Sequence, residues 1–301
     1  MSVAATLEWF GCATFRLRID GLVVMLDAYI DRAPDAAGPG VGVEAVDECD
    51  WILVGHAHFD HLYGAERIMA ATGATLVGSY ETVRVMTEAG VDPERMICVA
   101  GGETIDLSPT TTVSVYPSQH SCVWSHGQMT QPAEVCLGDL GVTWQEQQRK
   151  MQELMAHLTG TLAPGAVEHL LSSMGGHSPR GDGGALLFQV DSPGGSLLFQ
   201  DTSGHWSGII EGLDPDVAIL AAAGRANIDG EPIQGSLLEF LERQVTALSP
   251  ATTVLCHHDD WLPGFSVDTD MAPIRQLFER LPTELLELGY TDPTPLSALA
   301  G

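Results

Sequence analysis

The feature that most constrains this chain is a dense group of metal-binding side chains directly after a short apolar run. Residues 51–54 (WILV) predict a buried strand, and His56, His58, Asp60 and His61 follow it. Imidazole nitrogens and carboxylate oxygens are preferred ligands of zinc and related ions. Without a metal, each polar group left unsatisfied in such a cluster would cost about 1–3 kcal/mol. The pattern therefore predicts a metal site where a strand ends.

One loop cannot enclose two ions, and further donors stand at the ends of other predicted strands. They are His120 after residues 112–116, Asp201 after 196–199, and His257 and His258 after 253–255. Any one of them alone could be an ordinary polar residue at a strand end. Because all follow the C-terminal ends of apolar runs, we expect one rim of the sheets to collect them.

These residues resemble the signature of the metallo-β-lactamase-fold hydrolases, an HxHxDH segment after a strand followed by a separate His, an Asp and a last His. More narrowly, the chain resembles the branch that contains ascorbate-phosphate lactonase and the N-acyl-ethanolamine phospholipase D enzymes. Similar segments are WFGCAT (9–14), SQH (118–120), QDT (200–202) and CHHDDW (256–261). The resemblance covers both halves of the chain but not residues 122 to about 183. It departs at Ala28, where the family has proline after the Asp, and at Gln200, where it has glycine.

The resemblance implies two zinc ions, with manganese or iron as alternatives. One ion would be held by His56, His58 and His120, and the other by Asp60, His61 and His257, with Asp201 bridging the pair. The neighbouring His258 remains an alternative to His257. Zinc lowers the pKa of bound water towards about 7, so a metal-bridging hydroxide could attack a carbonyl carbon. Asp60 or Asp201 could then orient this nucleophile or pass its proton to the leaving group.

Other polar residues are candidates for supporting the ligands or for contacting the substrate. Histidine ligands commonly donate their second N–H to a carboxylate, a role open to several acidic residues near the ligands. The supporting candidates are Asp27, Asp259 and Asp260, the candidates for substrate contact are His205, His126 and His177, and the candidate anion anchors are Arg180 and Arg225. Each of these histidines could equally be an ordinary surface or turn residue.

The order of the predicted elements indicates an α/β (α+β) fold, an αββα sandwich of two facing mixed β-sheets with outer helices. An antiparallel start, with Asp20 and Gly21 in a tight hairpin turn, gives way to alternating strands and helices. We expect one domain over residues 1–301. Residues 122–183 interrupt the pattern and predict a helical insertion, with helical spacing from Trp144 to Leu158. This insertion could be a lid, an oligomer contact, or a segment that simply packs on the body.

Charge and cysteine content narrow the function. The chain has 40 Asp and Glu against 13 Lys and Arg, a formal charge of −27, which disfavours nucleic acid and anionic membranes as partners. Residues 1–9 lack the pattern of a secretory signal, so we expect a cytoplasmic protein. The six cysteines include no CxxC pair and predict reduced, mostly buried residues.

The sequence therefore predicts a zinc-dependent hydrolase of a small-molecule ester or lactone. A phosphodiesterase with the same metal pair is the alternative, and an iron-dependent oxidoreductase or dioxygenase of the same fold is a third hypothesis. The expected partners are a small-molecule substrate and, through the insertion, a second copy of the chain.

Overall fold

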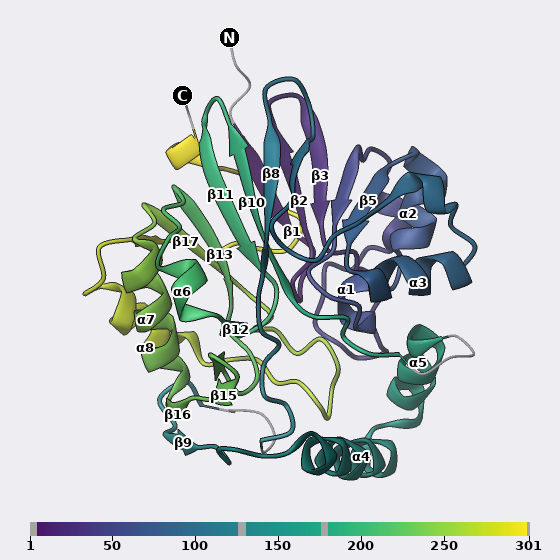
Figure 1. Cartoon of the computed structure of the whole chain (residues 1–301). Coiled ribbons are helices and arrows are strands. Elements are labelled where there is room, and N and C mark those ends of the chain that lie inside the picture. Colours follow the sequence, from purple (N-terminus) through teal and green to yellow (C-terminus); the bar gives the residue numbers. More distant parts are fainter. Residues whose placement is uncertain (1–4, 126–130, 176–179, 300–301) are drawn as a thin grey trace.

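The computed structural model describes residues 5–125, 131–175 and 180–299, and its strands form two large mixed sheets that face each other (Figure 1). The first sheet consists, in spatial order, of β19 (Thr294–Pro295), β1 (Thr6–Trp9), β2 (Phe15–Ile19), β3 (Leu22–Leu26), β4 (Trp51–Leu53), β5 (Thr75–Gly78) and β6 (Met96–Cys98). The second consists of β18 (Glu284–Leu285), β17 (Thr252–Cys256), β13 (Val217–Ala221), β11 (Gly195–Gln200), β10 (Leu186–Ser192), β8 (Thr112–Pro117) and β7 (Thr104–Asp106).

Strand directions bring the predicted donors to one rim. In the first sheet β1, β2 and β3 are antiparallel, and β3 to β6 run parallel. In the second, β11, β13 and β17 are parallel, while β10 is antiparallel to both β11 and β8. Therefore β8, β11 and β17 end at the same edge. The predicted hairpin is confirmed: Asp20 and Gly21 both have positive φ, 51° and 80°, as a tight turn of this kind requires.

The period of two along the strands produces the four layers. Phe188 and Phe199 face the core between the sheets, whereas their neighbours Leu187 and Leu198 face the outer helices. Helices α7 (Leu237–Leu248) and α8 (Met271–Phe278) cover the second sheet, and α2 (Ala65–Thr72) and α3 (Tyr80–Glu88) cover the first (Figure 1). The predicted αββα sandwich of two facing mixed sheets is confirmed.

Smaller elements complete the described chain. They are the helices α1 (Phe59–Leu62) and α6 (Ser207–Ile210), the 3-10 turns at Val43–Ala45, Pro93–Arg95 and Ser297–Leu299, and the short strands β9 (Cys136–Leu137), β12 (Gly204–His205), β14 (Asn227–Ile228), β15 (Glu231–Pro232) and β16 (Gln234–Gly235). No helix within the described ranges is long and apolar enough to cross a membrane.

The segment that interrupts the pattern contains two helices at one end of the molecule, α4 (Trp144–Thr161) and α5 (Pro164–Met174) (Figure 1). Thr143 begins α4 with a capping box that it forms with Glu146. Leu158 and Leu170 pack with Tyr29 and Trp261 in a core cluster of their own. The outer side of these helices exposes Trp144 (66%) and Leu171 (62%), while the role of the segment as lid or oligomer contact stays a prediction.

Candidate metal centre

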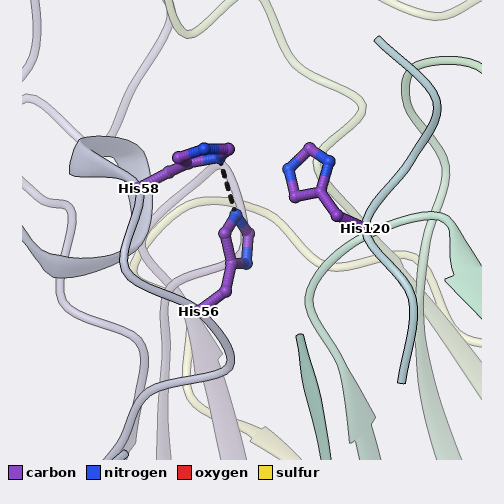
Figure 2. Close-up of side chains that lie close together, drawn as sticks. All are labelled: His56, His58 and His120. Atoms are coloured by element: carbon purple, nitrogen blue, oxygen red, sulfur yellow. Dashed lines mark hydrogen bonds between the residues drawn. The ribbon is translucent and has the colours of Figure 1, made fainter. Parts of the chain in front are cut away.

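Three histidines converge from the ends of two strands in opposite sheets. His56 and His58 lie in the loop after β4, and His120 follows β8 (Figure 2). His56 Nε2 lies 3.1 Å from His58 Nδ1, and the His120 ring centroid is 4.7 Å from each of the other two. One nitrogen from each ring lies within 4.8 Å of the others. This spacing could hold one metal ion with a small adjustment.

Asp201 joins this group from the end of β11. Its Oδ2 accepts a 2.6 Å hydrogen bond from His56 Nδ1 and lies 3.3 Å from His61 Nδ1. All three side chains are buried. The second oxygen, Asp201 Oδ1, is buried without a hydrogen-bond partner in the described part of the chain. A buried carboxylate oxygen in this situation is available to a cation.

A further donor group lies beside the first two. Asp60 Oδ2 is 3.2 Å from His257 Nε2 and 3.4 Å from His61 Nε2. The thiol of Cys12 completes a set in which the ligand atoms of Cys12, Asp60 and His257 lie within 4.8 Å of one another. The seven residues that the sequence resemblance assigned to metal therefore meet in space; whether each of them is a ligand remains a prediction.

The loop after β4 is shaped by contacts to both sheets. Gly55 N donates to Asp27 Oδ1 (2.9 Å), and Gly55 O accepts from Leu186 N of β10 (2.9 Å). A Cβ atom at Gly55 would lie 2.7 Å from Asp201 Oδ1 and nearer still to the rest of that carboxylate, so only glycine leaves room for it. Helix α1 begins immediately after His58, which places Asp60 and His61 on its single turn.

Asp27, which follows β3, holds one of the histidines in a fixed orientation. Its Oδ2 accepts a 2.6 Å hydrogen bond from His61 Nδ1, so the Nε2 of His61 is left to face Asp60. This direct contact is consistent with the predicted supporting role of Asp27. Ala28 N donates to His61 O (2.8 Å), a bond that the family's proline could not make.

The electrostatics of the donor side chains follow from their burial and from the shared carboxylates. Burial lowers the pKa of His56 and His58 well below the ordinary value. Burial alone would also lower the pKa of His61, but Asp60, Asp27 and Asp201 raise it well above that value. The cationic His61 is therefore balanced by surrounding carboxylates, a charge that a metal ion could replace.

The pKa values of the carboxylates are likewise shifted in opposite directions. Burial raises the pKa of Asp27 to about 7 against the opposing effect of His61, and burial also raises that of Asp201. Burial acts in the same direction on Asp60, but His61 and His257 outweigh it and hold the pKa of Asp60 well below the ordinary value. Buried imidazoles and carboxylates with unpartnered atoms, Asp201 Oδ1 and His257 Nδ1 among them, fit a bound divalent cation.

The choice between the two adjacent histidines is decided by the backbone. His257 adopts φ +60° and its N–H donates to Cys12 O (2.7 Å), which directs its ring towards Asp60. His258 instead stacks on Trp9, with ring centroids 4.8 Å apart and planes 8° from parallel. His257 therefore lies in the donor group, and the structure places His258 outside it.

Other sequence candidates lie elsewhere. Asp259 accepts from Cys12 N in the turn before β2 (3.0 Å) and from the Tyr290 hydroxyl (3.0 Å), and among the described residues its carboxylate bonds to no histidine ring. Asp260 accepts from Ser266 Oγ (2.7 Å). His205 is buried on β12 and stacks on Phe240 of α7 at 5.5 Å, and its contact with a substrate stays a prediction.

The remaining candidates divide between described and undescribed segments. His177 and His126 lie outside the described residues. Arg180 donates to the Ala57 carbonyl (2.6 Å) and to the carbonyls of Ser173 and Met174, which commits its guanidinium to main chain. The Gln200 side chain is likewise occupied, donating to Gly204 O (2.7 Å) and accepting from Gln244 Nε2 (2.6 Å).

Sequence reasoning missed two features of this region. Cys12 was expected to be a small buried apolar residue, although its place in the WFGCAT segment was the available signal. An aromatic wall formed by Tyr29, Phe59 and Trp261 also stands beside the donors. Trp261 meets His257 edge to face at 5.2 Å, and the Tyr29 hydroxyl bonds to His169 of α5 (2.9 Å).

Facing mixed sheets with a donor-rich rim define the class: the chain has the metallo-β-lactamase fold, as predicted. A family model described as a beta-lactamase superfamily domain matches residues 23–161. Igni18, a metallo hydrolase of Ignicoccus hospitalis, superposes with a TM-score of 0.62 at 16% identity, covering 98% of this chain and 99% of that one. CmlA, a diiron β-hydroxylase of Streptomyces venezuelae, superposes with a TM-score of 0.55 at 15% identity. This superposition covers 98% of this chain and 55% of that one.

The matches to curated sequences each cover less than half of the chain. A UPF0173 metal-dependent hydrolase of Pyrobaculum arsenaticum is 31% identical over 115 residues, which are 38% of this chain and 50% of that protein. The chain therefore spans about half the length of the curated relatives that it matches. The narrower likeness to the lactonase and phospholipase D branch stays a prediction.

Proposed function

We propose that the chain is a dinuclear zinc-dependent hydrolase of a small-molecule ester or lactone. The observation that carries this proposal is the meeting of the β4 loop with His120, Asp201 and His257 from three strands of the other sheet. When bound, a pair of zinc ions would supply an acidified water and an electrophile for the substrate oxygen. The similar Pyrobaculum protein is a metal-dependent hydrolase and Igni18 is a metallo hydrolase, which supports the same reaction class for this chain.

The protein's own contribution begins with fixing which ring nitrogens face the ions. The Asp27 carboxylate accepts a hydrogen bond from Nδ1 of His61 (2.6 Å), and the carbonyl of Ser121 accepts one from Nδ1 of His120 (2.8 Å). In both rings Nε2 is therefore the nitrogen left to bind. Preset rings of this kind lose little freedom when a cation arrives.

Asp60 and Asp201 are the proposed proton carriers. Asp60 stays ionised because its pKa is held low by His61 and His257, so its carboxylate oxygens can accept a hydrogen bond from water and orient it. Asp201 offers the unpartnered Oδ1 for the same task or for a cation. Either residue could return the proton to the leaving oxygen of an ester.

The aromatic wall favours an apolar group in the substrate. Phe59 is partly exposed and adjoins Asp60 in the chain, while Trp261 packs against the His257 ring. Such surfaces bind the hydrocarbon part of a small ligand and exclude water from the reacting bond. A net charge of −27 also favours a small, weakly charged substrate over a polyanion.

A phosphodiester substrate is the second candidate, and Arg225 is the observation that favours it. This residue is 5% exposed, and its Nε and Nη1 have no hydrogen-bond partner among the described residues. Its carbonyl accepts from Cys122 N (2.6 Å), two residues beyond His120. Two buried guanidinium nitrogens without acceptors are costly, and an anionic substrate group would relieve that cost.

A hydrolysis screen tests the proposal. Protein purified without added metal is assayed on lactones, aryl esters and bis(p-nitrophenyl) phosphate, with and without a chelator, alongside metal analysis. We expect chelator-sensitive cleavage of an ester or lactone by zinc-containing protein. His58→Ala should abolish it, whereas His157→Ala, on the exposed side of α4, should not.

Each other outcome has a definite meaning. Cleavage of the phosphate ester alone supports the second candidate. Stoichiometric iron with a visible absorption band would favour an oxidoreductase, as the likeness to diiron CmlA allows, and would overturn the zinc proposal. Wild-type rates in a His58→Ala protein that has lost its metal would refute the mechanism.

A further inference from the structure

The thiol of Cys12 lies at the edge of the donor group, although no cysteine was predicted to be a ligand. It comes from the turn between β1 and β2, far in the chain from both neighbours. Its Sγ donates to the Asp60 carbonyl at 3.5 Å, and it lies within 4.8 Å of a carboxylate oxygen of Asp60 and a ring nitrogen of His257. Cys12 is fully buried, and His257 Nδ1 is buried without a hydrogen-bond partner in the described segments.

The turn is fixed so that the thiol has little freedom to leave. Cys12 N donates to both carboxylate oxygens of Asp259 (3.0 and 3.1 Å). Cys12 O accepts from Trp9 Nε1 (3.1 Å) and from His257 N (2.7 Å). The last bond ties the backbone of the cysteine directly to that of the histidine whose ring shares its donor group.

We propose that Cys12 is a sulfur ligand of the second metal ion, together with Asp60 and His257, and that it makes this position selective for thiophilic divalent ions. The inference rests on the proposed metal centre and adds to it a ligand and a metal preference. Cysteine, histidine and aspartate together are a donor set that zinc accepts readily. Ligand atoms around a tetrahedral zinc lie about 3.3–3.8 Å apart, so a set within 4.8 Å needs only a small contraction. Manganese and magnesium, which prefer oxygen, should bind less tightly here.

The competing explanation is that Cys12 is a small buried residue with a weak bond to a carbonyl. Two features weigh against it. Cys12 has φ +50°, a left-handed conformation that glycine, asparagine or aspartate would adopt at lower cost. Its sulfur also lies within 4.8 Å of a carboxylate oxygen of Asp60 and a ring nitrogen of His257, a placement that packing in the apolar cluster around Tyr29 and Trp261 does not by itself require.

Cobalt(II) loading of the full-length protein tests this inference, because thiolate ligation gives an intense sulfur-to-cobalt charge-transfer band in the near ultraviolet. We expect wild-type protein to bind two cobalt ions and to show this band. Cys12→Ser and Cys12→Ala should lose it and keep the first ion. Cys256→Ser is the matched control, since that buried thiol donates to Gln200 O (3.6 Å) beside the site and should leave the band intact.

The outcomes separate the two proposals. Two bound cobalt ions without the band, or a band that survives in both Cys12 variants, would overturn the sulfur ligand and leave the metal centre standing. No bound cobalt in wild-type protein would overturn the centre itself. A competition of zinc against manganese gives an independent reading: Cys12→Ser should reduce the preference for zinc at the second ion about 10-fold or more. An unchanged preference contradicts the inference.

Discussion

Replacing Gly55 with alanine tests whether the Asp201 carboxylate is held in place by the absence of a side chain behind it. Gly55 does not have a positive φ, so its backbone accepts alanine without strain. The space around Gly55 is too small for the added methyl group, which would lie 2.7 Å from Asp201 Oδ1 and closer to the other carboxylate atoms. Because ordinary contacts begin near 3.5 Å, the carboxylate must move by roughly 1 Å.

The size of the effect follows from what that movement breaks. Asp201 Oδ2 accepts a 2.6 Å hydrogen bond from His56 Nδ1 between two buried side chains. A hydrogen bond to a charged group contributes about 1.5–3 kcal/mol. Since about 1.4 kcal/mol corresponds to a factor of ten in affinity, Gly55→Ala should weaken zinc binding about 10- to 100-fold.

Zinc affinity measured by competition with a chromophoric chelator is the direct assay. Denaturant unfolding of the metal-free protein should show a parallel loss of about 1–3 kcal/mol from overpacking. Gly208→Ala is the matched control, because its methyl meets nothing within 4 Å, and it should change neither quantity. Wild-type zinc affinity in Gly55→Ala would refute the argument that this glycine positions the carboxylate.

Three further predictions address other parts of the molecule. Asp27→Asn removes the anionic acceptor of the bond from His61 Nδ1 and should lower zinc affinity about 10- to 100-fold in the same competition assay; unchanged affinity would show that this ring needs no fixing. Burial against Phe240 lowers the pKa of His205 to about 4, so the folded protein keeps it neutral while the unfolded chain protonates it near about pH 6.5. Its stabilising contribution is therefore present above that pH and is lost as pH falls towards 4. Consequently, the stability lost between about pH 7 and pH 4.5 in denaturant unfolding should be about 2–3 kcal/mol smaller in His205→Phe, and equal losses in both proteins would contradict this. Phe199→Ala should lower the free energy of unfolding by about 3–5 kcal/mol because it opens a cavity between the sheets, and a loss below about 1 kcal/mol would argue against close packing there.

Much of the fold could be predicted because its signals are local. Strand alternation, the hairpin at Asp20 and Gly21 and the donors after β4 each depend on residues within a few positions of one another. The αββα sandwich followed from the order of these elements. The rim of donors followed from one further rule, that parallel strands end at the same edge.

The sequence by itself therefore determined the layers, the strand ends and the group of histidines and aspartates expected there. Tertiary structure alone decided which neighbours meet. His257 faces Asp60 while the adjacent His258 stacks on Trp9, His205 packs against Phe240, and Cys12 arrives from the first hairpin. The physical reason is that these contacts depend on backbone torsions and on chain segments up to hundreds of residues apart, which periodicity along the chain does not specify.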